Sequence, residues 1–250
     1  MSTSATEPYY PAPPVSACTD SSCRDMGAVD VDGDGQRDAV GWIRRTTTQE
    51  LVVRMATGAT ERITADYHRD SDLIAAIDAW FIELNGVKGA EIVLPVDANA
   101  GLKWYDVITW SGGRLNREAG FGPDTVAPTN HWSFGNEDDS ADLVRCTGPG
   151  AFEWTKLRIP YPGPARDWAR TGVIDYRLDL SAPIEGHRFR EVGRRSSTLD
   201  EARRALAGTD YRYPFACRMV IPVPTAGRSP SGAARESTVG QDLGADRPST

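Results

Sequence analysis

The chain has 250 residues, of which 40% are hydrophobic and 25% are charged, and its formal net charge is −7. This length and composition suit one folded domain with a substantial core, and all-β domains of this size are common. The negative charge argues against a nucleic-acid partner, because phosphate binding draws its affinity from clustered Lys and Arg. No segment approaches the roughly 18 uninterrupted apolar residues of a transmembrane helix.

Both ends of the chain have compositions typical of flexible segments. Residues 1–17 are rich in Ser, Thr and Pro, and residues 225–250 are rich in Gly, Ser, Ala, Pro and Arg. Neither end has enough apolar side chains to offset the entropy lost on ordering. We therefore expect a folded domain over residues 18–224, between a flexible N-terminal segment and a disordered C-terminal tail.

The acidic turn at residues 30–38 is the most informative motif in the chain. Calcium prefers about six to eight hard oxygen ligands, which a loop with acids at alternate positions supplies, and Gly35 suits the sharp turn at its sixth position. The ligands expected on this template are Asp30, Asp32, Asp34, Gln36 and Asp38. Gln36 would bind through its carbonyl oxygen and the others through side chains, Asp38 either directly or through water. The alternative is a solvated acidic turn.

The residues after the turn decide which kind of calcium loop this is. An EF-hand would need a bidentate Glu at position twelve and an exiting helix, but that position is Gly41. Residues 39–43 are instead short, apolar and partly β-branched, which predicts a strand. Two further strands are expected at residues 50–55 and 59–63, so the loop belongs to a β-structure.

Weaker copies of this pattern recur along the chain. Residues 81–93 overlay the first loop at an offset of 53, which aligns three polar residues with its acids: Glu83, Asn85 and Glu91. Val87 replaces the acid at position five, so calcium affinity should fall or vanish there. A third, more degenerate copy is expected around residues 134–144. The strand at residues 102–110 matches residues 152–160, with Trp104 aligned on Trp154; chance alternation is the other explanation.

The loop and the strand that follows it resemble the FG-GAP or VCBS-type repeats of secreted and surface proteins. The resemblance implies that such loops lie between strands of β-propeller blades, with calcium as a structural ion. We therefore expect an all-β fold of short antiparallel strands, arranged in three or four propeller-blade-like repeats as a partial or small β-propeller. Three visible repeats are few for a closed propeller, which usually has about four to eight blades.

The C-terminal half carries further strand signals and one helix signal. Residues 173–180 and 186–192 alternate apolar and polar residues, which predicts a last hairpin. Thr198 and Glu201 form a capping box, and Gly208 suits the end of a short C-terminal helix. A second helical pattern at residues 71–79 is less complete.

Four cysteines form an even set, which indicates two disulfides. We favour pairing Cys18 with Cys23 and Cys146 with Cys217, because the first pair is close in sequence and the second would join the last strands to the third repeat. A zinc site is the alternative, but it would need closer Cys spacings or neighbouring His residues. Free buried thiols are the other alternative.

The predicted location is extracellular or on the cell surface. Disulfides persist mainly in oxidising compartments, and extracellular calcium modules bind with dissociation constants of about 10⁻⁴ to 10⁻³ M. Residues 1–8 show no basic start or apolar run of a secretory signal. The export route is therefore left open, as is a cytoplasmic location.

The predicted function is a non-enzymatic calcium-binding β-repeat module that binds a protein or a carbohydrate. No catalytic motif of a hydrolase, metalloprotease or nucleotide-binding enzyme is visible. The alternative is a secreted hydrolase of glycosidase or esterase type that uses acidic residues. Most Trp residues are expected to pack in the blades, while Trp132 and Trp168 fall near loops and are the predicted ligand-binding aromatics.

Overall fold

The structure is a computed structural model that describes residues 14–67, 77–98, 102–118, 120, 131–137, 140–158, 170–179, 188–196, 198, 201, 204 and 214–226. These residues form β-strands with almost no helix. The all-β prediction is therefore confirmed. No helix among the described residues has the length and apolar character needed to cross a membrane.

The first sheet is an antiparallel meander of four strands. In chain order these are β1 (Cys23–Val29), β2 (Asp38–Arg44), β3 (Thr48–Arg54) and β4 (Thr60–Asp66). β2 and β3 lie in the centre, and their β-branched and apolar residues are almost entirely buried. β4 is an edge strand and is mostly exposed or half-buried. The strands predicted at residues 39–43, 50–55 and 59–63 are thus confirmed.

The second sheet starts with another antiparallel meander. Its strands are β5 (Trp80–Glu83), β6 (Glu91–Ala98), β7 (Leu102–Ser111) and β8 (Arg114–Arg117). The hairpin between β7 and β8 closes through Gly112 and Gly113, which both have positive φ. β9 (Trp132–Glu137) pairs with the first half of β7, beside β8, and extends the sheet.

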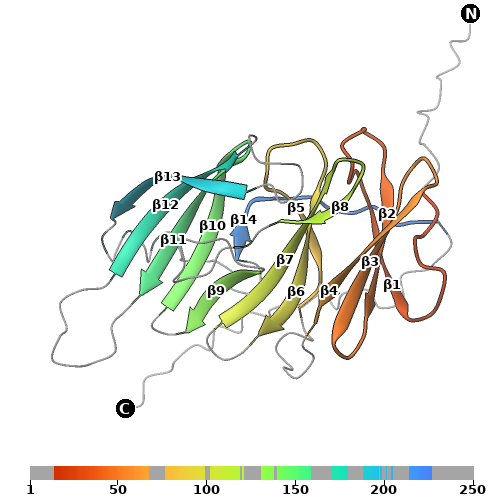
Figure 1. Ribbon diagram of the computed structural model, residues 1–250, viewed down its shortest axis with the longest axis horizontal. Coiled ribbons are helices and arrows are strands. Elements are labelled where there is room, and N and C mark those ends of the chain that lie inside the picture. Colours follow the sequence, from red (N-terminus) through yellow and green to blue (C-terminus); the bar gives the residue numbers. More distant parts are fainter. Residues whose placement is uncertain are drawn as a thin grey trace, which may run out of the picture.

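A third meander continues the second sheet. It contains β10 (Ser140–Gly148), β11 (Ala151–Arg158), β12 (Arg170–Asp179) and β13 (Arg188–Ser196), and the last two form the predicted hairpin. We name the runs β1–β4, β5–β8 and β10–β13 the first, second and third modules. Figure 1 shows them in an open row, and the described strands close into neither a barrel nor a propeller.

Two apolar cores join neighbouring modules. The first core combines residues of the first and second modules, such as Trp42 and Ile108. The second core combines the second and third modules and is rich in aromatic rings, with Tyr105 and Trp154 fully buried in it. Because successive residues of a strand point to opposite faces, β7 contributes Ile108 to one core and Tyr105 to the other.

The predicted equivalence of Trp104 and Trp154 is wrong. Trp154 is fully buried in the second core, whereas Trp104 is only half-buried and belongs to neither core. The residue of β7 that faces the second core is its neighbour, Tyr105. β7 is the third strand of the second module, whereas β11 is the second strand of the third module, so the alignment at an offset of 50 matched strands that are not equivalent.

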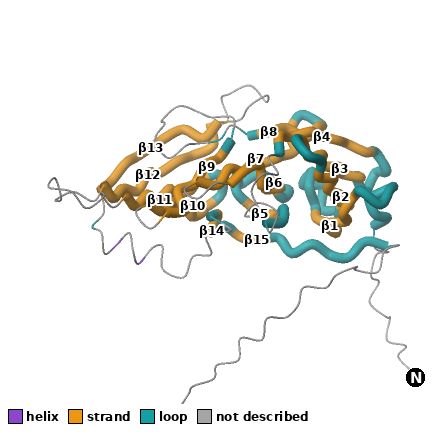
Figure 2. The backbone as a smooth tube through the Cα atoms, turned by 90° about the horizontal axis from the view of Figure 1, so that it is seen from below, coloured by secondary structure: helices purple, strands orange, loops and turns teal. Residues whose placement is uncertain are grey.

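A C-terminal strap, residues 214–226, crosses all three modules. It contains β14 (Phe215–Ala216), which pairs with β10, and β15 (Arg218–Met219), which pairs with β5. Farther on, Val223 exchanges two backbone hydrogen bonds with Ala28 of β1, of 2.8 and 3.0 Å. The strap therefore contacts the first strand of every module, and Figure 2 shows it running from β15 toward β1.

Both predicted disulfides are present. Cys18 is joined to Cys23 beside the first module, and Cys146 of β10 is joined to Cys217 of the strap. Disulfides are found mainly in proteins of oxidising compartments. The pair therefore suggests an oxidising, extracellular environment.

The predicted domain limits at residues 17 and 224 fall slightly inside the ordered structure. Val15 forms a bridge with Ala226, and Ala17 is buried against the first module. Residues 1–13 and 227–250 lie outside the described residues, so their predicted flexibility stays a prediction. The same holds for the second helical pattern, most of which falls on residues 68–76.

The predicted C-terminal helix is not seen as an element of the described structure. Only Thr198, Glu201 and Arg204 of this segment are described. The capping box itself is formed: the Glu201 backbone N–H donates to Thr198 Oγ1 at 3.2 Å, and the Thr198 backbone N–H donates to Glu201 Oε2 at 2.8 Å. The local hydrogen bonds of a helix start are therefore present, and most of the residues that would continue the helix lie outside the described part of the chain.

The loops that join the first two strands of each module pack tightly against one another. The Ala90 backbone N–H of the second module donates to the Asp30 carbonyl of the first at 2.8 Å. A Cβ on Gly33 would lie 2.5 Å from the Lys88 carbonyl oxygen, so there is no room for a side chain. Gly86 is packed in the same way against Gly150 of the third module.

We expect Gly33→Ala to destabilise the protein more than Gly35→Ala. Both glycines have positive φ, so each substitution strains the backbone by about 1–3 kcal/mol. Gly35 has open space around it, whereas Gly33 meets Lys88, and overpacking should cost about 1–3 kcal/mol more. Urea unfolding of both variants in the presence of a chelator measures the difference. Equal losses of stability would show that the loops do not depend on this contact.

Candidate metal centre

The first loop is closed by strand pairing and by its own carboxylates. Val29 at the end of β1 pairs with Asp38 at the start of β2, which leaves eight residues, 30–37, in the loop. Asp30 Oδ1 accepts the Gly33 backbone N–H at 2.7 Å, and its Oδ2 accepts that of Gly35 at 3.0 Å. Asp30 therefore holds both glycines of the turn.

Asp38 anchors the base of this loop. Its carboxylate is fully buried and accepts two backbone N–H groups, from Val31 at Oδ2 and from Ala56 at Oδ1, both at 2.8 Å. Burial raises the pKa of Asp38, and these two hydrogen bonds act against that shift. The side chain thus ties the loop to the end of β3 as well as to β1.

Three of the five predicted calcium ligands come together. Asp30, Asp32 and Asp38 each place a carboxylate oxygen so that all three oxygens lie within 4.8 Å of one another. Partial burial raises the pKa of Asp32, and the charges of Asp34 and Asp30 raise it further. The cluster therefore disfavours its own negative charge, which a bound cation would relieve.

The other two predicted ligands, Asp34 and Gln36, contact each other. The Gln36 backbone N–H donates to Asp34 Oδ1 at 2.6 Å, and its side-chain amide donates to Asp34 Oδ2 at 3.0 Å. Asp34 does not belong to the cluster of three carboxylates. Its predicted role as a ligand stays a prediction.

The donor set of the cluster fits a hard cation. Carboxylate oxygens are the preferred ligands of calcium, which tolerates irregular geometry and usually fills its remaining positions with carbonyl oxygens and water. Zinc favours His and Cys ligands, and neither residue type belongs to the group. The residues that would hold calcium are therefore Asp30, Asp32 and Asp38.

The second loop has the same backbone construction as the first. Ile82 pairs with Glu91 as Val29 pairs with Asp38, an offset of 53 on both strands. Glu91 accepts the Leu84 backbone N–H at 2.7 Å, the counterpart of the bond from Val31 to Asp38. The predicted repeat of the first loop in the second is thus visible in register and in hydrogen bonds.

The polar side chains of the second loop are used differently. Glu83 forms an ion pair with Arg218 of the strap at 3.1 Å. Asn85 Oδ1 accepts the Val87 backbone N–H at 2.7 Å, as Asp32 accepts that of Asp34 in the first loop. Among the described residues, only the first loop brings three metal-ligating acids together.

Burial raises the pKa of two carboxyl groups in the second module, those of Glu91 and Glu118. Both carboxyl groups are almost fully buried, and desolvation raises the pKa of each to about 7. Backbone hydrogen bonds from Leu84 and Asn85 oppose the shift of Glu91, while the charge of Glu118 adds to it. Thr109 Oγ1 donates to Glu118 Oε1 at 2.9 Å. The second module therefore holds two carboxyl groups whose pKa lies near neutral pH.

The third predicted loop is wrong. Residues 134–144 belong to β9 and β10, which pair directly from Glu137 to Ser140, so only residues 138 and 139 separate them. The position that stacks next to the second loop is the turn between β10 and β11, where Gly86 meets Pro149 and Gly150. That turn contains no acid, so the third module lacks a comparable acidic loop there.

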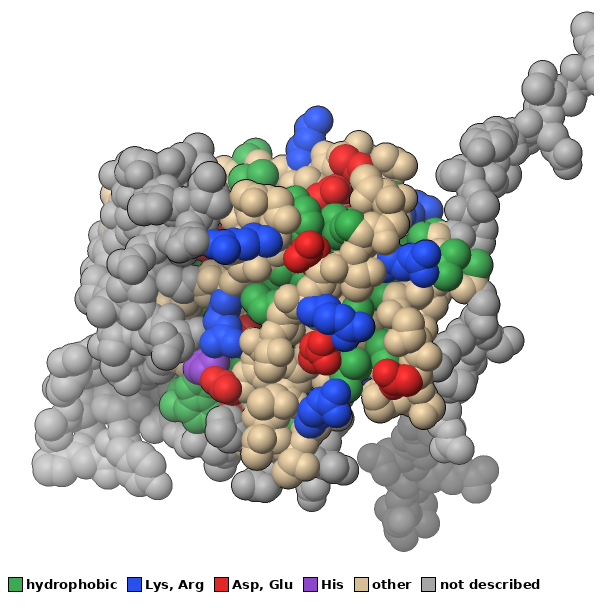
Figure 3. Space-filling model, turned by 45° about the vertical axis from the view of Figure 1, so that its right-hand side comes forward, with side chains coloured by type: hydrophobic (Ala, Val, Ile, Leu, Met, Phe, Trp, Pro, Cys, Tyr) green, Lys and Arg blue, Asp and Glu red, His purple; other side chains and the backbone are tan. Residues whose placement is uncertain are grey.

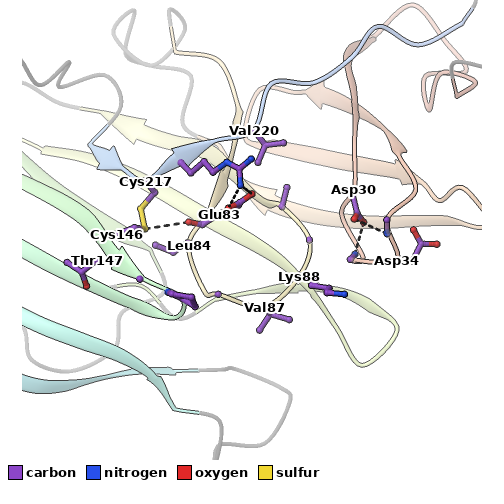
Figure 4. A pocket seen from close by; sticks show the side chains of 18 of the residues that line it. Asp30, Asp34, Glu83, Leu84, Val87, Lys88, Cys146, Thr147, Cys217 and Val220 are labelled. Atoms are coloured by element: carbon purple, nitrogen blue, oxygen red, sulfur yellow. Dashed lines mark hydrogen bonds and ion pairs between the residues drawn. A yellow bond between two sulfur atoms is a disulfide. The ribbon is translucent and has the colours of Figure 1, made fainter. Parts of the chain in front are cut away.

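A groove lies beside the stacked loops. It has a volume of about 910 Å³ and is lined by both loops, by the turn after β10 and by the strap. Figure 4 shows Cys146 and Cys217 beside Glu83, and Val87 and Lys88 farther along the second loop, nearer to Asp30 and Asp34. Asp30 and Asp34 of the first loop form one end of its lining. The candidate metal centre therefore adjoins the groove.

Trp132 is not a surface residue, which contradicts its predicted role in ligand binding. It is fully buried in the second core and contacts the rings of Phe152 and Trp154 at centroid distances of 5.7 and 6.5 Å. Strand β9 begins at Trp132 and turns it inward, so its position near a loop was misleading. Trp168 lies outside the described residues.

Sequence reasoning missed a buried polar contact on β7. Asp106 is fully buried, and its carboxylate lies 2.7 Å from His131 Nδ1 and 3.2 Å from Arg117 Nε. The contact joins β7, β8 and the start of β9. No local motif marks it, because 25 residues separate the acid from the histidine. It orients the imidazole but brings no nucleophile with it among the described contacts.

Charged side chains outside these sites are mixed in sign. Figure 3 shows basic and acidic side chains interspersed over one face of the molecule. Exposed ion pairs include Arg62 with Glu50 at 2.8 Å. Such surface pairs contribute little to stability, so this face offers no strong electrostatic signal for a partner.

No family model, curated protein or solved structure matches this chain. The resemblance to FG-GAP or VCBS-type repeats therefore stays a prediction. Its support comes from the repeated construction of the first two loops.

We expect stability to fall as the pH rises through neutrality. The pKa values of Glu91 and Glu118 are raised from 4.5 to about 7 in the folded protein. Their stabilising contribution is complete below about pH 4.5 and is lost as the pH rises through about 7. As the pH rises, the free energy of unfolding of Glu118→Gln should fall by roughly 2–3 kcal/mol less than that of the wild-type protein. Unfolding by urea between about pH 5 and pH 8, with chelator present, measures it.

Glu61→Gln on the edge strand β4 is the matched control, and its free energy of unfolding should depend on pH as that of the wild-type protein does. If the free energy of unfolding of Glu118→Gln also keeps the full dependence on pH, Glu118 is charged throughout this range and the explanation by burial fails.

Proposed function

We propose that this protein is a non-enzymatic, calcium-stabilised β-repeat module of the FG-GAP or VCBS type that acts outside the cytoplasm. The observation that carries the proposal is the convergence of Asp30, Asp32 and Asp38 in a loop between two strands. Three neighbouring carboxylates repel one another, and calcium would neutralise them and fix the loop. The ion is structural in this proposal and takes part in no reaction.

The repeat part of the proposal is supported by the second loop. Leu84 and Glu91 reproduce the hydrogen bond between Val31 and Asp38, and Gly86 has the positive φ of Gly33. These three residues of the second loop follow their counterparts in the first at one constant offset. The simplest explanation is an ancestral loop that was duplicated and then lost its metal ligands in the second copy.

The extracellular part of the proposal combines one observation with one expectation. Two disulfides suit an oxidising compartment. A loop with few carboxylate ligands should bind calcium weakly, within the range of about 10⁻⁴ to 10⁻³ M that extracellular modules use. Both features favour a secreted or cell-surface protein.

The proposed activity is binding of a protein or a carbohydrate. The groove beside the loops is the concave surface that we propose for the ligand, because loops from two modules and the strap converge there. Val87 is 47% exposed beside it and offers an apolar contact. With Trp132 buried, this groove and Trp168 are the places where we propose that a ligand binds.

Calcium should raise the stability of the wild-type protein and not that of Asp32→Asn. Metal that binds only the folded state stabilises it by about 2.7 kcal/mol at a hundredfold excess over the dissociation constant. Thermal melting with millimolar calcium, with millimolar magnesium and with chelator measures the shift. Magnesium should have a smaller effect, because it demands regular octahedral geometry.

Asp66→Asn is the matched control, since Asp66 is an exposed acid at the end of β4 in the same module. It should keep the full calcium effect. A wild-type protein without a calcium-dependent shift, or an Asp32→Asn variant with an unchanged one, would overturn the proposal.

A further inference from the structure

The strap is attached to the modules very unevenly. Its deepest anchor is Phe215, which is buried in the second core and contacts the rings of Phe134 and Trp132 at centroid distances of 5.1 and 5.4 Å. The far end is held by the hydrogen bonds between Val223 and Ala28. Ala28 is next to Gly27, where the Pro222 side chain and the Val223 carbonyl fill the space of a Cβ. Both ends of the strap are therefore firmly packed.

The middle of the strap, residues 216–221, has much weaker contacts. Met219 and Ile221 are 54% and 86% exposed. β15 consists of two residues, and Arg218 pairs with Glu83 on the exposed surface, where an ion pair contributes little. The Val220 backbone N–H donates to the Phe81 carbonyl at 2.9 Å. The strongest link of this part is the disulfide between Cys217 and Cys146.

The two disulfides differ in their surroundings. Cys146 and Cys217 are half-buried and both line the groove, and Figure 4 shows their bond at its wall. In the other pair Cys18 is also half-buried, but Cys23 is only 3% exposed, and both sulfurs pack against Gly41, where they fill the space of a Cβ. A reductant should therefore reach Cys146 and Cys217 through the groove before it reaches the other pair.

We propose that the Cys146–Cys217 disulfide is a redox-sensitive latch, whose reduction by a dithiol releases the middle of the strap and opens the groove. The ends of the strap stay in place, because Phe215 and Val223 are held by packing and hydrogen bonds that do not involve the disulfide. The latch is independent of calcium, since none of its residues belongs to the cluster of three aspartates.

The chemistry of release is ordinary thiol–disulfide exchange. A thiolate of the dithiol attacks one sulfur of the Cys146–Cys217 bond, that bond breaks, and a mixed disulfide forms. The second thiol of the reductant then displaces the remaining cysteine. Two electrons pass from the dithiol to the protein, which gains two thiols, and the reductant becomes a cyclic disulfide.

Hydrogen exchange of the full-length protein tests this latch, with dithiothreitol as the probe and calcium present throughout. Graded reduction should speed exchange at the Val220 amide roughly tenfold or more, while the Ala28 and Val223 amides keep their protection. Alkylation and mass spectrometry of the same samples should find label on Cys146 and Cys217 before Cys18 and Cys23. The variant Cys146→Ser with Cys217→Ser should show the fast Val220 exchange without any reductant.

The control is Cys18→Ser with Cys23→Ser, in which Val220 should keep its protection. Unchanged exchange at Val220 after reduction would overturn the proposal. Simultaneous loss of protection at Val220, Ala28 and Val223 would overturn it as well, because the disulfide would then be a general staple of the fold. If the Cys146→Ser, Cys217→Ser variant does not fold, the titration of the wild-type protein decides by itself.

Discussion

The first and second loops both depend on a buried carboxylate at the first position of the second strand of their module. Asp38 and Glu91 each accept a backbone N–H from the residue two places after their partner on the neighbouring strand, and so fix where each loop begins. A buried negative charge is expensive unless it is compensated. In the first loop Asp38 stands with Asp30 and Asp32, which a cation would neutralise. In the second loop burial raises the pKa of Glu91 to about 7, so protonation can neutralise this carboxylate where the first loop would use a cation.

The fixed loops in turn set how the modules pack. Gly33 and Gly86 have no space for a side chain, because the neighbouring loop or turn occupies it. The loops therefore determine the spacing at one end of the modules, and the two apolar cores join each module to the next. The strap adds a third connection across the first strands, closed by Cys146 and Cys217. Loop, core and strap together hold the modules in an open row, which the described strands do not close into a ring.

The sequence predicted those features that local chemistry encodes. The acidic loop, the strand after it, the offset of the second loop and both cysteine pairings are all visible as residue types at fixed spacings. The prediction of a third loop was wrong because the acids at residues 137–139 resemble the motif but lie where β9 and β10 pair directly. The true counterpart, the turn at Pro149 and Gly150, contains no acid. The prediction for Trp132 was wrong because a residue near a loop can still point into the core.

Long-range contacts could not be predicted from the sequence. The contact of Asp106 with His131 depends on β9 returning beside β7, and the strap depends on short strands of two residues each. Cys217 was the one signal that the last described segment returns to the fold. The role of Glu118 depends on burial, which its neighbours in sequence do not reveal.

A crystal structure of the protein crystallised in millimolar calcium tests the central claim most directly. The account predicts a cation among Asp30, Asp32 and Asp38, with oxygen ligands at about 2.3–2.6 Å and an anomalous signal that identifies calcium, while the second loop at Glu91 holds none. A first loop without a cation under these conditions, or a cation bound at Glu91, would contradict the account.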